Sequence, residues 1–585
     1  MLSSKLKADI RALWDRFWSG GIANPLTAIE QITYLVFLKQ LEDLDNQRAR
    51  EAQEAGRVHQ SIFDNPPKDP NAPPTDKPTD KKTKEVDRAT FRWSYIKELP
   101  SEERLNHVRS DVFDWLKTIP GVQDRMRDAV FVIPSPNLLE GAIKTIDKLF
   151  VPARNQDTLG DVYEMLLSEI AEAGKNGQFR TPRHIIRLMC DLVDPRIGDR
   201  ICDPACGTAG FLVNAYQHIL KSNTSPDILQ FEADGTPLFA VGDQLTAAQH
   251  EQLRHNHFYG FDFDRTMVRL GWMNMIQHGM IEPQVNYADA LGSRFNNELL
   301  VNGGAIGDFD VILANPPFKG SIDINDIGES LKELDTTKTE LLFVELILQL
   351  LRVGGRAAVI VPEGLLFGST NAHRTLRKKL VEENQLNAVI SLPGGVFQPY
   401  ASVKTSILFF VRGGQTEKVW FYEVGVDGLS LNAKRTDQFE RNDLWDLTLK
   451  ARLRFTTTYP QPVPAFIDGD TWRAWQSYND EERSVHYLKP QLAVQEEMDG
   501  EGEMVALSVR AGFQTEEMNT AKDWVGGQEN LQENDYNLSA GRYKPFSLET
   551  VKHDPPALII KELQKLESQL QSGLTDLLEM VGDVA

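Results

Sequence analysis

The residues best suited to chemistry lie in two short stretches of this 585-residue chain. The first, residues 203–212 (DPACGTAGFL), is typical of a ligand loop between a strand and a helix. The second follows the strand-like run 309–314 and brings together an amide, two prolines and an aromatic ring: Asn315, Pro316, Pro317 and Phe318. In an open α/β sheet both stretches face one crevice at the carboxyl ends of the strands, where ligands bind.

The first stretch has the residues of a tight turn. Gly207 and Gly210 provide turns without a Cβ, and Thr208 adds a hydroxyl group. The spacing fits neither the dinucleotide fingerprint Gly-x-Gly-x-x-Gly nor the phosphate-binding loop with its lysine. A plain strand-to-helix connection is the alternative interpretation.

Three further stretches stand in a fixed order around these two. Residues 260–262 (GFD) end a second predicted strand with the carboxylate of Asp262, although Asp264 is a nearby competitor and such a carboxylate also serves solubility. Asp289 follows a short third strand. Upstream, residues 177–183 (GQFRTPR) precede a predicted helix, and Thr181 is expected to be its N-cap.

With these pieces in this order, the chain resembles the M subunit of type I restriction–modification systems. The resemblance covers most of the chain and includes residues 392–397 (LPGGVF) followed by 403–406 (VKTS). A cofactor loop ahead of a catalytic tetrapeptide is the order of the gamma group of N6-adenine DNA methyltransferases. The tetrapeptide alone recurs by chance, whereas the ordered set is specific.

The resemblance implies S-adenosylmethionine as the cofactor. Asp203 would accept from the cationic amino group, Asp262 from two ribose hydroxyls and Asp289 from the adenine amino group. The segment that contains Thr181 would cover the methionine end. The implied cofactor-binding residues are Phe179, Thr181, Asp203, Ala205, Gly207, Thr208, Gly210, Asp262 and Asp289.

The tetrapeptide suits methylation of an adenine amino group, whose lone pair is delocalised into the ring. The side-chain oxygen of Asn315 and the carbonyl of Pro316 can each accept one amino hydrogen, which directs the lone pair at the methyl group. Phe318 can stack on a base flipped out of the duplex. Phe397 or Tyr400 is a candidate for a second stacking face, with ordinary core packing as the alternative for each.

Other activities fit the residues less well. Methylation of cytosine C5 needs a cysteine nucleophile, typically after a proline, and none of Cys190, Cys202 and Cys206 follows one. Protein glutamine methyltransferases carry tyrosine where this chain has Phe318. The intact tetrapeptide opposes a scaffold without catalysis. A solitary adenine methyltransferase remains the alternative, and it would have to recognise its DNA site through residues 455–545.

The net charge of −21 argues that the chain binds DNA poorly without help. Either this sum hides a local basic groove or a partner binds the DNA, and we expect a partner. The resemblance implies a specificity (S) subunit that reads double-stranded DNA, a second M subunit and a restriction (R) subunit. A leucine stripe from Ile559 to Met580 predicts a C-terminal docking helix, with packing on its own chain as the alternative.

The elements that must position these residues form an α/β fold, with a Rossmann-like, mostly parallel sheet built from short apolar runs separated by helices. Residues 407–411 suit an antiparallel edge strand. The predicted regions are an N-terminal helical domain (1–152, with a mobile loop at 65–88), a methyltransferase domain (153–454), an irregular acidic region (455–552) and the docking helix (553–585).

The surroundings of the chain are also predictable in outline. No apolar run reaches the roughly 20 residues that a membrane helix needs, and the N-terminus lacks a signal peptide. Three cysteines are too few for a disulfide scaffold and form no Cys-x-x-Cys pair, so we expect a cytoplasmic protein without a metal site.

Overall fold

The computed structural model describes residues 4–54, 56–65, 87–149, 160, 162–163, 165–167, 181–231, 236–399, 401–455, 469–490, 513–517, 521–545, 560–561 and 564–571. Within these ranges no helix is both long and apolar enough to cross a membrane. Residues 1–543 form one compact unit and residues 544–585 another. Most of the predicted mobile loop, residues 66–86, lies outside the described ranges.

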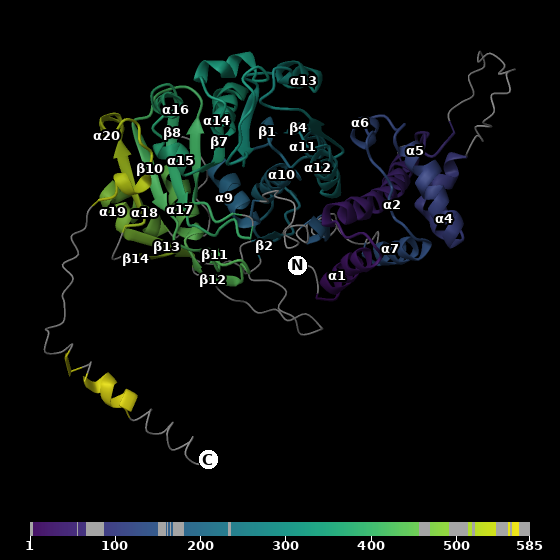
Figure 1. Ribbon diagram of the computed structural model, residues 1–585, viewed down its shortest axis with the longest axis horizontal. Helices are drawn as coiled ribbons and strands as arrows, with labels where there is room; N and C mark the ends of the chain where they lie inside the picture. Colours follow the sequence, from purple (N-terminus) through teal and green to yellow (C-terminus); the bar gives the residue numbers. More distant parts are fainter. Residues whose placement is uncertain are drawn as a thin grey trace. The chain divides into compact units, whose positions relative to one another are not determined.

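The largest sheet among the described residues has nine strands, in the order β15-β10-β8-β9-β7-β6-β1-β4-β5. Figure 1 shows this sheet with β10, β8, β7, β1 and β4 labelled. Its strands are parallel except for β9 and β15, which run antiparallel to their neighbours. The predicted mostly parallel α/β fold is confirmed. The bounds are β1 Ile201–Asp203, β4 His255–Asp262, β5 Glu282–Tyr287, β6 Phe309–Ala314, β7 Leu351–Pro362, β8 Gln385–Leu392, β9 Thr405–Val411, β10 Lys418–Glu423 and β15 Asp523–Gly527.

Successive residues of each strand face opposite sides of the sheet, and each side is a hydrophobic core. Ile201 and Val311 belong to one cluster, whereas their chain neighbours Cys202 and Ile312 belong to the other. The first cluster includes residues of α9 (Arg183–Val193), α10 (Gly210–Ser222), α12 (Arg265–Gln277) and α17 (Leu444–Phe455). The second includes residues of α13 (Phe295–Val301), α14 (Thr339–Leu350), α15 (Gly364–Phe367), α16 (Asn371–Glu382) and η3 (Glu329–Leu334).

The predicted N-terminal helical region is confirmed. Helix α2 packs on α12, where the rings of Phe37 and Trp272 meet edge to face at 5.2 Å and Arg269 pairs with Glu30 at 2.7 Å. The helices are α1 Ser4–Ser19, α2 Pro25–Glu54, η1 Arg88–Phe91, α3 Trp93–Glu98, α4 Ser101–His107, η2 Val108–Val112, α5 Phe113–Leu116, α6 Gln123–Met126 and α7 Pro136–Leu149.

Several other described elements are short. They are α11 Ala247–Arg254, α18 Gly469–Ser477, α19 Asp480–Val485, α20 Gln528–Glu533 and η4 Ala540–Arg542, with the strand pairs β2 Gln230–Phe231 and β3 Pro237–Leu238, β11 Asp427–Leu429 and β12 Asp437–Asn442, and β13 His486–Pro490 and β14 Phe513–Glu517.

The edge position predicted for residues 407–411 is wrong, although their antiparallel direction is confirmed. Strand β9 lies between β7 and β8, and all seven of its residues are buried. The sheet continues past β8 through β10, whose central residues Val419–Tyr422 are buried. Proximity along the chain suggested an edge hairpin, but β9 instead enters the sheet between two parallel strands.

The prediction that residues 455–552 are irregular is also wrong for the part of this region that the structure describes. Strand β15 pairs antiparallel with β10 and closes this edge of the sheet. The carboxylate of Asp523 at its start is fully buried, and it pairs with the fully buried Lys450 of α17 at 2.6 Å. The indole of Trp420 donates to the same carboxylate at 3.0 Å. The positive charge of Lys450 compensates the buried carboxylate of Asp523. Asp523 therefore belongs to the folded domain and not to an extended segment.

Candidate active site

The strand register brings three of the predicted site residues to one edge of the sheet. Asp203, the last residue of β1, lies opposite Gly260 of β4, two residues before Asp262. On the other side, Cys202 lies opposite Ile312 of β6, three residues before Asn315. Strands β4 and β6 flank β1 and belong to the two halves of the sheet, so these side chains stand where the strand order reverses. That position is the usual ligand crevice of an open α/β sheet.

The loop after β1 contains two residues in the left-handed backbone conformation. Gly207 has φ 50° and Ala209, the N-cap of α10, has φ 61°. The turn predicted at Gly210 is therefore wrong, because Gly210 is the first helical residue of α10. Backbone hydrogen bonds hold the loop, from Cys206 N to the Phe261 carbonyl at 2.9 Å and from Ala209 N to the Cys206 carbonyl at 2.7 Å. A Cβ on Gly207 would meet no described atom within 4 Å, so this side of the loop is open to a ligand.

Asp262 and its competitor Asp264 have different partners. Asp262 accepts from the backbone N–H of Gly207 at 2.9 Å and from that of Asp264 at 2.9 Å. Asp264 instead caps α12 by accepting from Thr266 N at 2.8 Å. Burial, with a contribution from the Asp264 carboxylate, raises the pKa of Asp262. Because Asp264 is engaged in capping, Asp262 is the carboxylate directed at the loop, and its ribose role stays a prediction.

Burial of the Asp203 carboxyl group costs free energy. Its side chain is 1% exposed and accepts a hydrogen bond from Ala205 N at 3.0 Å. Burial raises the pKa of Asp203 to about 8, and repulsion from Asp262 adds to the shift. A buried carboxylate is stabilised by a cation. The predicted contact with a cationic amino group therefore fits this environment.

Asn315 has a hydrogen-bond partner at one end of its amide and none among the described residues at the other. Its Nδ2 donates to the hydroxyl oxygen of Thr181 at 2.9 Å. Its Oδ1 is buried and has no hydrogen-bond partner among the described residues. The N-cap role predicted for Thr181 is wrong, because Pro182 is the N-cap residue of α9 and Thr181 lies one residue earlier. A buried acceptor without a partner is costly, which points to a donor that arrives with a ligand.

Of the aromatic candidates, the structure describes Phe318 and Phe397. Phe318 is 7% exposed, and its ring meets that of Phe397 edge to face with the centroids 5.7 Å apart. Phe397 is 1% exposed, which agrees with a core residue that supports Phe318. Phe179 and Tyr400 lie outside the described residues. Asp289 is exposed after β5, where its carboxylate accepts from Leu291 N at 3.2 Å.

Three residues around the loop were not predicted from the sequence. A Cβ on Gly271 of α12 would lie 2.8 Å from the Gly207 carbonyl oxygen, so only glycine lets the helix approach the loop this closely. One turn later Asn274, fully buried, donates to the Thr208 carbonyl at 2.9 Å. Gly260 of β4 similarly leaves room for the Cys206 side chain. A glycine inside a helical pattern, with an asparagine three residues on, was the available signal.

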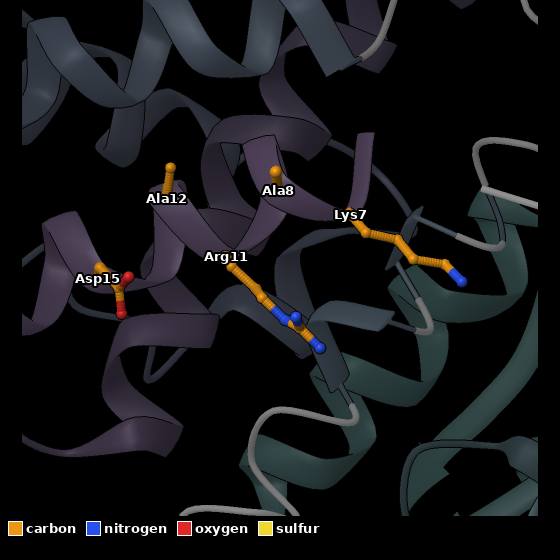
Figure 2. A pocket seen from close by; sticks show the side chains of 5 residues that line it. All are labelled: Lys7, Ala8, Arg11, Ala12 and Asp15. Carbon is orange, nitrogen blue, oxygen red and sulfur yellow. The ribbon is translucent and has the colours of Figure 1, made fainter. Parts of the chain in front are cut away.

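A hollow on the surface of α1 has no part in this site. It is lined by Lys7, Ala8, Arg11, Ala12 and Asp15, which project from one helix (Figure 2). Its lining contains none of the predicted site residues.

Comparisons with known proteins identify the family of the two main regions. Residues 154–450 match the N-6 DNA methylase family and residues 6–146 match the HsdM N-terminal domain. The EcoEI methylase subunit of a type I restriction enzyme from Escherichia coli is 32% identical over 54% of this chain and 62% of its own length. The StySPI methylase subunit from Salmonella potsdam is 30% identical over 60% of this chain and 65% of its own length. The chain thus matches less than two thirds of each relative.

One solved structure extends the likeness of fold to nearly the whole chain. It is a modification subunit of a putative type I restriction enzyme from Vibrio vulnificus YJ016, with a TM-score of 0.61 and 21% identity. The match covers 94% of this chain and 99% of that one.

Gly271 allows the first test of the site. Gly271→Ala places a Cβ against the Gly207 carbonyl, so the loop or α12 must shift. We expect the affinity for S-adenosylmethionine to fall by about tenfold or more while the chain stays folded. Gly364→Ala is the matched control, because a Cβ there meets no described atom within 4 Å. Calorimetry and thermal melting separate the two effects, and wild-type affinity in Gly271→Ala would contradict the packing argument.

The raised pKa of Asp203 gives a second test. Below about pH 8 the unliganded carboxyl group is mostly protonated, so it must lose a proton before it can pair with a cation. We expect calorimetric affinity for S-adenosylmethionine to rise from pH 6 to pH 7.5, with proton release on binding. Asp203→Asn should bind weakly at every pH in this range. A wild-type affinity that is flat with pH, with tight binding by Asp203→Asn, would show that Asp203 does not contact the cofactor.

Proposed function

Since the chain belongs to the N-6 DNA methylase family, as its resemblance predicted, we propose that it transfers a methyl group from S-adenosylmethionine to the exocyclic N6 of adenine in DNA. The observation that carries this proposal is the buried Oδ1 of Asn315, an acceptor without a partner among the described residues. It lies at the end of β6, on the same edge of the sheet as the carboxylates of Asp203 and Asp262.

Around the adenine, the reaction needs hydrogen-bond acceptors, because the amino group offers two hydrogens and its lone pair is delocalised into the ring. Asn315 Oδ1 would accept one hydrogen and the carbonyl of Pro316 the other. This arrangement pulls the nitrogen toward tetrahedral geometry and directs its lone pair out of the ring plane. Pro316 is buried and its ring restricts the backbone, so its carbonyl keeps its direction. Transfer then depends on positioning, with little acid–base chemistry.

The cofactor side is formed by the ends of β1 and β4. When bound, S-adenosylmethionine supplies an electrophilic methyl group. Asp203 would hold the amino group and Asp262 the ribose hydroxyls, and the open side of Gly207 would admit the ligand. The carboxyl group of Asp203 is buried and would be stabilised by a cation, which supports a contact with the cofactor's amino group.

The base must leave the duplex to reach Asn315 Oδ1. Extrusion costs a few kcal/mol, which stacking can offset. Phe318 would stack on the base, and Phe397 would hold the Phe318 ring edge to face.

Asn315→Ala tests the proposed function. The variant loses an acceptor that acts mainly in the transition state, so we expect methyl transfer to fall by about 100-fold or more. Calorimetric affinity for S-adenosylmethionine should be largely retained. Asn302→Ala is the matched control, since within the described part of the chain that side chain makes a local hydrogen bond, to the Glu298 carbonyl at 2.7 Å. Turnover near wild type in Asn315→Ala would refute the assignment.

We also propose that the chain is the methylation subunit of a type I restriction–modification complex. The relatives at about 30% identity are named as methylase subunits of type I restriction enzymes. The net charge of −21 calls for a partner that supplies positive surface and reads the DNA sequence. An S subunit has that role in our proposal, with a second M subunit and an R subunit completing the complex in the cytoplasm. The alternative is a solitary adenine methyltransferase.

The C-terminal helix is the proposed docking element. Of the stripe from Ile559 to Met580, the structure describes residues 560–561 and 564–571, which are helical. Ile560, Leu566 and Leu570 are exposed there. Burial of such side chains against helices of an S subunit would drive assembly, at roughly 25 cal/mol per Å² before association costs.

Truncation after Pro556 tests the docking proposal. The shortened chain should fold and bind S-adenosylmethionine but lose co-purification with the S subunit and methylation of DNA. The paired substitutions Leu566→Glu and Leu570→Glu should have the same effect, whereas Glu567→Gln should not. A truncated chain that still co-purifies would place docking elsewhere, and a full-length chain that methylates specific sites alone would favour the solitary enzyme.

A further inference from the structure

The contact between Thr181 and Asn315 joins residues that are 134 positions apart in the sequence. Thr181 is 7% exposed, and its hydroxyl oxygen accepts from Asn315 Nδ2 at 2.9 Å. In this contact the amide presents its Nδ2 end to Thr181. With Nδ2 directed at Thr181, the acceptor Oδ1 is left free for a ligand.

The orientation matters because the two ends of an amide have opposite hydrogen-bonding character. An adenine amino group brings two donors, which Oδ1 can accept and Nδ2 cannot. If the amide were reversed, donors would face donors, and the buried NH₂ group would repel the group it should bind. A threonine hydroxyl can accept from Nδ2 or donate to Oδ1. In the structure it accepts from Nδ2, and this hydrogen bond holds the amide in the productive orientation.

Thr181 is itself fixed by the helix that follows it. Ile185 and Ile186 of α9 are buried, and a Cβ on Gly210 would lie 3.3 Å from the Ile186 side chain, so α9 packs against the start of α10. Next to them His184 pairs with the buried Asp427 of β11 at 2.9 Å. Helix α9 is thus anchored to both the cofactor loop and the β11–β12 pair, and Thr181 lies two residues before it begins.

We propose that Thr181 is a positioning residue for methyl transfer, which holds the Asn315 amide so that Oδ1 faces the amino group of the acceptor base. This inference rests on the proposed function and adds a role beyond the cofactor contact expected from sequence resemblance. Thr181 need not touch the base, since it acts through the orientation of Asn315.

Thr181→Val tests the proposal, because it keeps the shape of the side chain and removes the acceptor. We expect kcat for methylation of unmodified genomic DNA to fall by about 10- to 100-fold in the complete complex, at saturating cofactor. The KM for DNA should change little, and any loss of calorimetric affinity for S-adenosylmethionine should be smaller than the loss in kcat. Thr181→Ser keeps the hydroxyl and should recover most of the rate.

A double-mutant cycle excludes a general loss of structure. In the Asn315→Ala background there is no amide to orient, so Thr181→Val should cause little further loss in single-turnover rate. Additive losses would overturn the proposal, as would a normal kcat in Thr181→Val, or a loss of cofactor affinity with kcat intact, which would make Thr181 only a cofactor residue. Failure of the proposed function is distinguishable, because the wild-type complex would then transfer no methyl group to adenine.

Discussion

The parallel register of β4, β1 and β6 is the constraint on which the candidate site depends. It aligns Asp203 with Gly260 and Cys202 with Ile312, so the residues that follow each strand emerge at one edge. A slip of one residue in any of these strands would turn its side chains to the opposite face of the sheet. The register is protected by burial on both faces, because Ile201 and Cys202 belong to different hydrophobic cores.

Within this frame the site concentrates groups that a stable fold would avoid. Ala209 adopts a left-handed conformation, which costs an L-residue about 1–2 kcal/mol. Among the described residues, Asp203 is buried without a cation and Asn315 Oδ1 is buried without a donor. Packing elsewhere has to offset these costs, and a ligand that brings a cation and a donor would relieve two of them. The three features share one edge of the sheet, which is why we propose that edge as the site.

The sequence was sufficient to predict the fold where patterns are local. Short apolar runs gave β1, β4, β6, β7, β8 and β9, and the ordered motifs led to Asp203, Asp262 and Asn315. It failed where distant segments meet. The place of β9 between β7 and β8 depends on pairing with both, and the burial of Asp523 depends on Lys450, 73 residues away.

The same limit applies within the site. Thr181 was read as a helix cap because capping is a local pattern, whereas its actual partner, Asn315, is set by the tertiary fold. Gly271 and Asn274 were missed for a related reason, since their importance comes from a close approach to residues 207–209 that no local pattern in α12 reveals.

The most direct measurement of the central claim is a crystal structure of the full-length chain with S-adenosylmethionine. The account predicts the cofactor's amino group at the Asp203 carboxylate, its ribose hydroxyls at Asp262, and Asn315 Oδ1 open toward the methyl group with Nδ2 still on Thr181. A cofactor bound away from the ends of β1 and β4, or an Asn315 Oδ1 hydrogen-bonded within the protein, would contradict it.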